Sequence, residues 1–173
     1  MKKDSLILIN TGDGKGKSTA AFGTLIRSLG HGKKCAVIQF IKSQNPTGES
    51  KFFHSIPNID FHSMGKGFTW DSANLEVDKA AAREGLEKAK EYLNNPEYTT
   101  VLLDEITYTV HFKFLDIEEI ISAIQQRSPL TNVIITGRDC PQELIEIADC
   151  VTVMHKEKHP FDNNIPARKG IDF

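Results

Sequence analysis

The sequence predicts a single α/β domain with a mainly parallel β-sheet flanked by helices. Short apolar runs bounded by turn residues alternate with segments of helical periodicity, which is typical of parallel strands joined by helical crossovers. The length of 173 residues suits one domain with a sizeable buried core and is short for two. We therefore expect residues 1–173 to form one domain.

The expected strands are short apolar runs of the kind found in buried parallel strands. They cover residues 6–9, 36–41, 101–103, 133–135 and 151–153, with one further short strand around 59–64. The expected helices cover residues 17–29, 75–93, 116–126 and 141–148.

Two stretches fall outside this alternation. Apart from the strand near residue 60, residues 43–74 look like a long loop rich in glycine, proline and aromatic residues, and such loops are often functional. Residues 155–173 show no periodicity, but the apolar side chains of Phe161, Ile165, Ile171 and Phe173 predict that part of this tail docks on the domain.

Charge and cysteine content narrow the function classes. The 21 Lys and Arg residues nearly balance 23 Asp and Glu, so a dedicated nucleic-acid binder is not expected. The three cysteines form no CxxC pair, which is typical of reduced thiols. No apolar run is long enough for a membrane span or a signal sequence. We expect a cytoplasmic protein without a membrane partner.

The sharpest motif is a phosphate-binding loop between the first strand and the first helix. Alternate glycines let backbone N–H groups approach phosphate oxygens, and the helix N-terminus adds partial positive charge. Lys17 supplies a mobile cation and Ser18 a hydroxyl for Mg²⁺. Because Thr11 stands at the first glycine position of GxxxxGK[ST], the loop is a variant. The predicted nucleotide-binding residues here are Gly12, Asp13, Gly14, Lys15, Gly16, Lys17, Ser18 and Thr19.

An apolar strand ending in Asp104 and Glu105 fits the acidic half of such a site. In an ATPase, Asp104 would hold Mg²⁺ directly or through water, and Glu105 would polarise a water molecule. In a group transferase with no attacking water, Glu105 is free to be a metal ligand. The residues alone leave both alternatives open. Arg138 follows another strand at the same sheet edge, where it either faces the triphosphate or is a solvated surface residue.

Phe68 and Trp70 lie in a glycine-flanked loop. Exposed loop aromatics often bind large flat ligands, and the alternative is that the rings fold onto the core.

Together, and in their order along the chain, these motifs resemble those of the bacterial ATP:corrinoid adenosyltransferases. The resemblance extends from about residue 6 to the last residue. The matching segments are residues 11–23, 30–34, 39–42, 67–71, 103–108, 135–138, 158–161 and 169–173. The resemblance implies a RecA-like P-loop fold and a homodimer. It also implies transfer of the 5′-deoxyadenosyl group of ATP to the Co(I) centre of a corrinoid, with release of triphosphate, to make adenosylcobalamin or its precursor.

The resemblance also assigns roles. Lys17, the loop amides and Mg²⁺ or Mn²⁺ at Ser18 and Glu105 would stabilise the departing triphosphate. Lys15 would add charge, and Asp104 is a further expected metal ligand. Phe68 and Trp70 would pack against the lower face of the corrin and displace the axial cobalt ligand. An electron donor is needed for cobalt, and a flavoprotein reductase is the expected class. The competing hypotheses are a P-loop ATPase or kinase that cleaves the γ-phosphate, and a non-catalytic nucleotide-sensing or corrinoid-carrying module.

Overall fold

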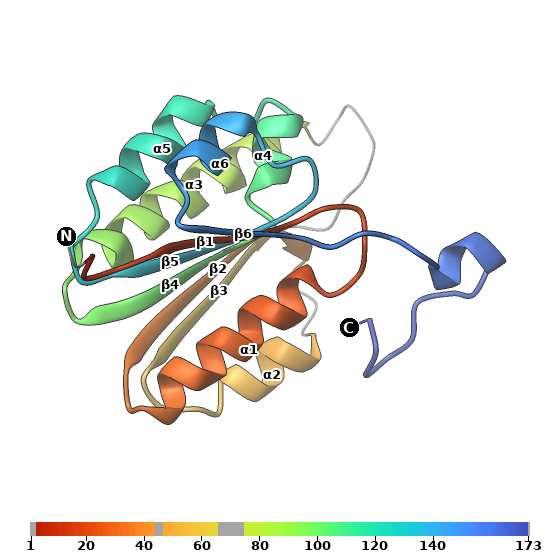
Figure 1. Cartoon of the computed structure of the whole chain (residues 1–173), viewed down its shortest axis with the longest axis horizontal. Helices are drawn as coiled ribbons and strands as arrows, with labels where there is room; N and C mark the ends of the chain where they lie inside the picture. Colours follow the sequence, from red (N-terminus) through yellow and green to blue (C-terminus); the bar gives the residue numbers. More distant parts are fainter. Residues whose placement is uncertain (1–2, 44–46, 66–74, 173) are drawn as a thin grey trace.

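The computed structural model describes residues 3–43, 47–65 and 75–172. It contains a six-stranded parallel sheet in the order β3-β2-β4-β5-β1-β6 (Figure 1). The predicted α/β class with a parallel sheet is confirmed, and the sheet is consistent with a RecA-like P-loop fold. No helix within the described ranges is both long enough and apolar enough to cross a membrane.

The strands are β1 (Ile7–Thr11), β2 (Lys34–Ser43), β3 (Ile59–Gly65), β4 (Tyr98–Asp104), β5 (Asn132–Thr136) and β6 (Cys150–Val153). The helices are α1 (Lys17–Gly30), α2 (Gly48–Phe53), α3 (Leu75–Asn94), α4 (Thr107–His111), α5 (Ile117–Gln125) and α6 (Gln142–Ile147), followed by the 3₁₀ helix η2 (Pro160–Asn163).

The helices cover both faces of the sheet, with α1 and α2 on one side and α3, α4, α5 and α6 on the other (Figure 1). Each face has its own apolar core. On the α1 side, Phe22 stacks on Phe53 of α2 and on Phe61 of β3, with ring centroids 5.3 and 6.3 Å apart. On the other side, α3 and α5 pack on β1, β2, β4 and β5. The strands are therefore buried on both faces, which is why they appear in the sequence as continuous apolar runs.

The region 43–74 is less of a loop than the sequence predicts. The expected strand is present as β3, Ser43 is the last residue of β2, and α2 is an additional helix. The Thr47 side chain caps α2 by accepting a hydrogen bond from the Ser50 amide, and Phe53 anchors it in the core. Phe68 and Trp70 lie outside the described residues, so their predicted arrangement stays a prediction.

The C-terminal tail is held differently from what the sequence predicts. Its apolar side chains do not anchor it, because Phe161 is 59% exposed, Ile171 is 69% exposed, and Ile165 is also exposed. The tail runs out from β6 and returns toward the start of α1 (Figure 1). Polar contacts at the phosphate loop hold it there. Phe173 lies outside the described residues.

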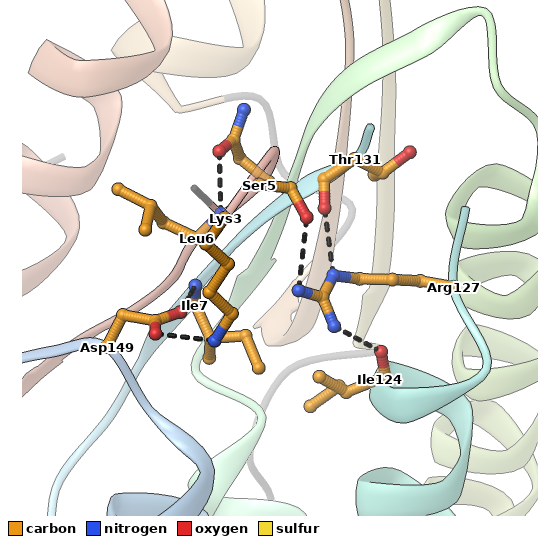
Figure 2. A network of polar contacts seen from close by, with 9 residues as sticks. Lys3, Ser5, Leu6, Ile7, Ile124, Arg127, Thr131 and Asp149 are labelled. Atoms are coloured by element: carbon orange, nitrogen blue, oxygen red, sulfur yellow. Dashed lines mark hydrogen bonds and ion pairs between the residues drawn. The ribbon is translucent and has the colours of Figure 1, made fainter. Parts of the chain in front are cut away.

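The amino end of the sheet is closed by a network of polar contacts around the start of β1 (Figure 2). The Asp149 carboxylate accepts hydrogen bonds from the Ile7 amide at 2.8 Å and from Lys3 Nζ at 2.5 Å. The Arg127 guanidinium donates to the carbonyl oxygens of Ile124 and Thr131, both at 2.9 Å, and to the Ser5 hydroxyl at 3.2 Å. These contacts fix β1 between its neighbours.

Candidate active site

The phosphate loop joins β1 directly to α1. Gly16 is the N-cap residue of α1, with a φ of 113°, and Lys17 is the first residue of the helix. A φ of this sign strains any residue with a side chain, so glycine suits the position. The Lys17 ammonium donates to the carbonyl oxygen of Gly14 at 2.5 Å, which folds the lysine back over its own loop.

The backbone after β6 crosses the phosphate loop. The Gly14 amide donates to the carbonyl oxygen of Met154 at 2.7 Å, and the Lys156 amide donates to Asp13 Oδ1 at 3.2 Å. A Cβ on Gly12 would lie 2.5 Å from the Met154 carbonyl oxygen, and one on Gly14 would lie 2.7 Å from that of His155. These two glycines therefore permit a close backbone crossing, and the Gly14 amide is engaged by the tail in this structure.

A pocket of about 200 Å³ opens beside the phosphate loop. It brings together residues from the phosphate loop, α2, the ends of β4 and β5, and the tail. The lining residues are Lys15, Gly16, Lys17, Ser18, Thr19, Glu49, Glu105, Tyr108, Arg138, Ile171 and Asp172. The structure thus places five of the predicted loop residues, Glu105 and Arg138 around one space, whereas the sequence left the position of Arg138 open.

The pocket combines three cations, Lys15, Lys17 and Arg138, with the carboxylates of Glu49, Glu105 and Asp172. Burial lowers the pKa of the Lys17 ammonium, the nearby Arg138 lowers it further, and Glu105 is among the acidic groups that oppose this. Lys15 pairs with Asp172 of the tail at 2.5 Å. Burial also raises the pKa of the Tyr108 hydroxyl, which therefore stays a neutral hydrogen-bond donor. Such a set of cations and donors suits a polyanionic ligand.

Asp104 and Glu105 differ in position although they are adjacent. Asp104 is fully buried beneath the pocket, and its two carboxylate oxygens accept hydrogen bonds from Gln39 Nε2 at 2.9 Å and Thr136 Oγ1 at 2.7 Å. Glu105 is half-buried, lines the pocket and has a φ of 63°. Of the three predicted metal ligands, Ser18 and Glu105 line the pocket, whereas Asp104 is buried and is not among the lining residues.

The turn after β5 carries Arg138 and depends on a glycine. Gly137 has a φ of 144°, and a Cβ there would lie 1.9 Å from the Thr107 hydroxyl oxygen. That hydroxyl donates to the Arg138 carbonyl oxygen at 2.7 Å. The start of α4 is thereby tied to the turn that presents Arg138.

Three polar side chains of the pocket, together with the apolar tail residue Ile171, were not predicted as site residues from the sequence. Glu49 comes from the unpredicted helix α2, Tyr108 follows the acidic strand end, and Asp172 lies in the tail. Tyr108 and Asp172 fall within the segments that carry the family resemblance, and that resemblance is the signal that could have identified them as site residues. For Glu49 the sequence offers none.

A larger hollow of about 580 Å³ lies between β3 and α3 and contains no residue of the phosphate loop. Its lining includes His62 and Met64 on β3 and Glu76 and Val77 on α3. We take the smaller pocket as the candidate active site because it gathers residues from five separate parts of the chain around the phosphate loop.

Comparison with known proteins agrees with this arrangement. A family model described as ATP:corrinoid adenosyltransferase BtuR/CobO/CobP matches residues 3–173. The chain belongs to this family. The family expectation drawn from the ordered motifs is therefore confirmed.

Individual ATP:corrinoid adenosyltransferase relatives match over nearly the whole chain. A corrinoid adenosyltransferase of Escherichia coli strain K12 is 45% identical over 168 residues, covering 97% of this chain and 85% of the relative. Corrinoid adenosyltransferase CobA of Salmonella typhimurium is 43% identical with the same coverage. A corrinoid adenosyltransferase of a Sinorhizobium species is 42% identical over 171 residues, covering 97% of this chain and 80% of the relative.

Proposed function

We propose that this enzyme transfers the 5′-deoxyadenosyl group of ATP to the Co(I) centre of a corrinoid and releases triphosphate. Family membership supports adenosyl transfer from ATP to a corrinoid. The observation that links this reaction to particular residues is the pocket beside the phosphate loop, which is lined by Lys17, Arg138 and Glu105.

The main task of this pocket is to stabilise a leaving group. As the bond from C5′ to the triphosphate breaks, negative charge grows on the phosphate chain. Fixed cations and backbone amides aimed at that charge lower the barrier without reorganising. Lys17, Arg138 and the amides at the start of α1 supply them here, with Lys15 at the rim. Gly12 and Gly14 contribute by shaping the loop against the tail.

The donor set of the pocket fits Mg²⁺ or Mn²⁺. Mg²⁺ is commonly bound by one or two protein oxygen ligands together with substrate phosphates and water. Ser18 and Glu105 line the same pocket and would hold it with their hydroxyl and carboxylate oxygens, next to the buried carboxylate of Asp104. When bound, the ion would neutralise part of the triphosphate charge.

No general base is required from the protein, because Co(I) is itself the nucleophile. The chain must instead hold C5′ in line with cobalt, which is a matter of orientation. We propose that Phe68 and Trp70 pack on the lower face of the corrin and keep the axial ligand away, so that cobalt is more easily reduced. They belong to the segment that joins β3 to α3.

Further parts of the proposal concern partners and compartment. We propose that the enzyme acts as a homodimer and receives electrons for cobalt from a flavoprotein reductase. A cytoplasmic location is supported by Cys35, Cys140 and Cys150, which are all free thiols.

The deciding experiment is anaerobic. The purified enzyme is mixed with ATP, Mg²⁺ and chemically reduced cob(I)alamin, and both the corrinoid spectrum and the phosphate product are followed. We expect light-sensitive adenosylcobalamin and an equal amount of triphosphate. ADP and phosphate with an unchanged corrinoid would instead establish the ATPase or kinase alternative, and nucleotide binding without turnover would establish a sensing or carrier module.

A second experiment tests the aromatic residues. The double variant Phe68→Ala with Trp70→Ala should lose activity with Co(II) substrate plus reductant, and should lose much less with pre-reduced Co(I). An equal loss on both substrates would contradict the ligand-displacement role.

A further inference from the structure

A chain of buried hydrogen bonds runs beneath the pocket across four neighbouring strands. It starts at Ser63 on β3, passes through Gln39 on β2 and Asp104 on β4, and reaches Thr136 on β5. The Ser63 hydroxyl donates to Gln39 Oε1 at 3.0 Å, and Gln39 Nε2 donates to Asp104 Oδ2 at 2.9 Å. Thr136 Oγ1 donates to Asp104 Oδ1 at 2.7 Å. Gln39, Asp104 and Thr136 are each fully buried.

The last link of this chain is the backbone of Glu105. The Glu105 amide donates to Thr136 Oγ1 at 2.9 Å. Thr136 has a single hydroxyl proton, which it gives to Asp104, so its oxygen is left to accept from the Glu105 amide. The Asp104 carboxylate accepts from both sides and thereby sets the orientation of the Gln39 amide as well. The donor and the acceptor of each hydrogen bond in this chain are therefore fixed.

Glu105 needs such support because of its backbone. Its φ of 63° places a residue with a side chain in the left-handed region. That conformation is uncommon for residues other than glycine and persists where the surroundings impose it. The hydrogen bond to Thr136 holds the amide in place, and the left-handed turn directs the chain after β4 along the pocket wall. The backbone from which the Glu105 side chain extends is thus tied to Thr136.

We propose that Thr136 and Gln39 are positioning residues that hold Glu105 in the orientation needed to bind the metal–ATP complex. The inference rests on the proposed function, in which Glu105 is a metal ligand. Asp104 transmits the constraint between the two residues from below the pocket. Hydrogen bonds behind the ligands of a metal are known to set its affinity, and their removal typically costs about 10- to 100-fold.

The geometry favours this role over a purely structural one. Well-packed apolar residues can replace a buried polar network with little loss of stability, so the network is not needed for burial alone. At the β5 end, the network leaves the core at the strained residue Glu105, which lines the pocket. The inference also predicts a gradient, in which an effect on metal binding falls from Thr136 through Gln39 to Ser63.

The test measures metal binding in the absence of corrinoid, with Mn²⁺ as a paramagnetic probe titrated into the protein with saturating ATP. Thr136→Val is nearly isosteric and removes both hydrogen bonds, whereas Thr136→Ser keeps the hydroxyl. We expect Thr136→Val to weaken Mn²⁺ binding by about tenfold or more, and Thr136→Ser to restore it. Gln39→Met gives a second variant with a smaller loss in the same direction.

Glu105→Gln serves as the reference, because it removes the proposed ligand itself. If Thr136 acts through Glu105, the double variant should bind Mn²⁺ no more weakly than Glu105→Gln alone. An added loss in the double variant, or unchanged binding in both Thr136→Val and Gln39→Met, would overturn the inference. So would an equal loss in Thr136→Ser and Thr136→Val.

Failure of the proposed function is recognised separately. If Glu105→Gln leaves Mn²⁺ binding unchanged, Glu105 is not a metal ligand, and the inference falls with that assignment. If the wild-type enzyme forms no adenosylcobalamin, the proposed reaction fails whatever the Mn²⁺ titrations show. The thermal melting temperature of each variant, measured alongside, identifies any that does not fold.

Discussion

Each end of the parallel sheet carries a polar network, and the two networks differ in composition and in surroundings. At the amino end, Arg127, Asp149 and Lys3 close the start of β1 with charged side chains and backbone groups (Figure 2). At the carboxyl end, Asp104 and Thr136 are buried beneath a pocket lined by cations. The first network ends on the backbone of β1, whereas the second ends on a strained residue that faces a cavity.

The difference shows that a polar network is not by itself a functional site. Both networks satisfy buried backbone groups, which any α/β domain must do at the ends of its strands. At the carboxyl end, glycine-dependent turns, a helix N-terminus and unlike charges surround an open space. Changes there should alter activity, and changes at the amino end should alter stability.

The largest expected effect is on activity at the carboxyl end. Lys17→Gln removes the cation that folds back over the phosphate loop and should lower kcat/KM for ATP by about 100- to 1,000-fold, as is typical when one donor to developing negative charge is lost. Lys34→Gln is the matched control, because Lys34 is an exposed lysine at the amino end paired with Glu97. Steady-state kinetics on both variants would contradict the comparison if they lost similar activity.

The next effect is on stability at the amino end. Arg127→Met keeps the apolar stem of the side chain but removes three hydrogen bonds. The carbonyl oxygens of Ile124 and Thr131 then lose their arginine donor. We expect the free energy of unfolding to fall by roughly 2–3 kcal/mol, with an unchanged KM for ATP. Urea denaturation and ATP saturation curves measure the two quantities. A raised KM at normal stability would show that the two ends are coupled.

Two glycines at the carboxyl end of the sheet and in the helix that follows allow a comparison of tolerance to substitution within one region. Gly12→Ala places a Cβ against the Met154 carbonyl and needs a φ of 100°, so it should cost roughly 1–3 kcal/mol of stability. Gly23→Ala lies on the exposed side of α1 with no atom nearby, and should instead stabilise by about 0.5–1 kcal/mol. Thermal denaturation of both variants tests the signs. Destabilisation by Gly23→Ala would argue that α1 is generally intolerant of substitution.

The smallest effect is a pH dependence at the amino end. The Lys3 ammonium, and then the Ile7 amide, hold the pKa of Asp149 below its usual range. A lowered carboxyl pKa adds stability above the usual value near 4, and this stability is lost as pH falls through the lower folded value. Asp149→Asn should therefore unfold at a lower temperature than wild type at pH 6, with a difference that shrinks in stronger acid. Glu146→Gln, at an exposed position on α6, is the control for the removal of one carboxylate.

Much of the sheet could be predicted because its strands are buried on both faces. Residues 133–135 form a continuous apolar run, and β5 contains them. The helix α2 could not be predicted, since six residues have little helical preference of their own and depend on the Thr47 cap and on Phe53 in the core. Short elements of this kind are set by tertiary packing.

In the candidate site, too, local motifs could be predicted and contacts set by tertiary packing could not. The phosphate loop and the acidic strand end are local motifs, so Lys17, Ser18 and Glu105 could be identified from the sequence. Gln39 appeared there as one residue of an apolar strand, and its partner Asp104 lies on a different strand. Asp172 reaches Lys15 only because the tail folds back. Contacts between residues so far apart in a single sequence leave no local pattern.

The strand order also has a consequence for how the enzyme is made. β1 pairs with β5 and β6, which begin at Asn132 and Cys150, so it has no strand neighbour while most of the chain is still being synthesised. At ordinary rates of translation this delay is of the order of ten seconds. During that time the phosphate loop has been synthesised, but β5 and the segment after β6 that contacts the loop have not. Because the pocket includes Arg138 after β5 and Asp172 in the tail, nucleotide meets the complete pocket only after the end of the chain has been added.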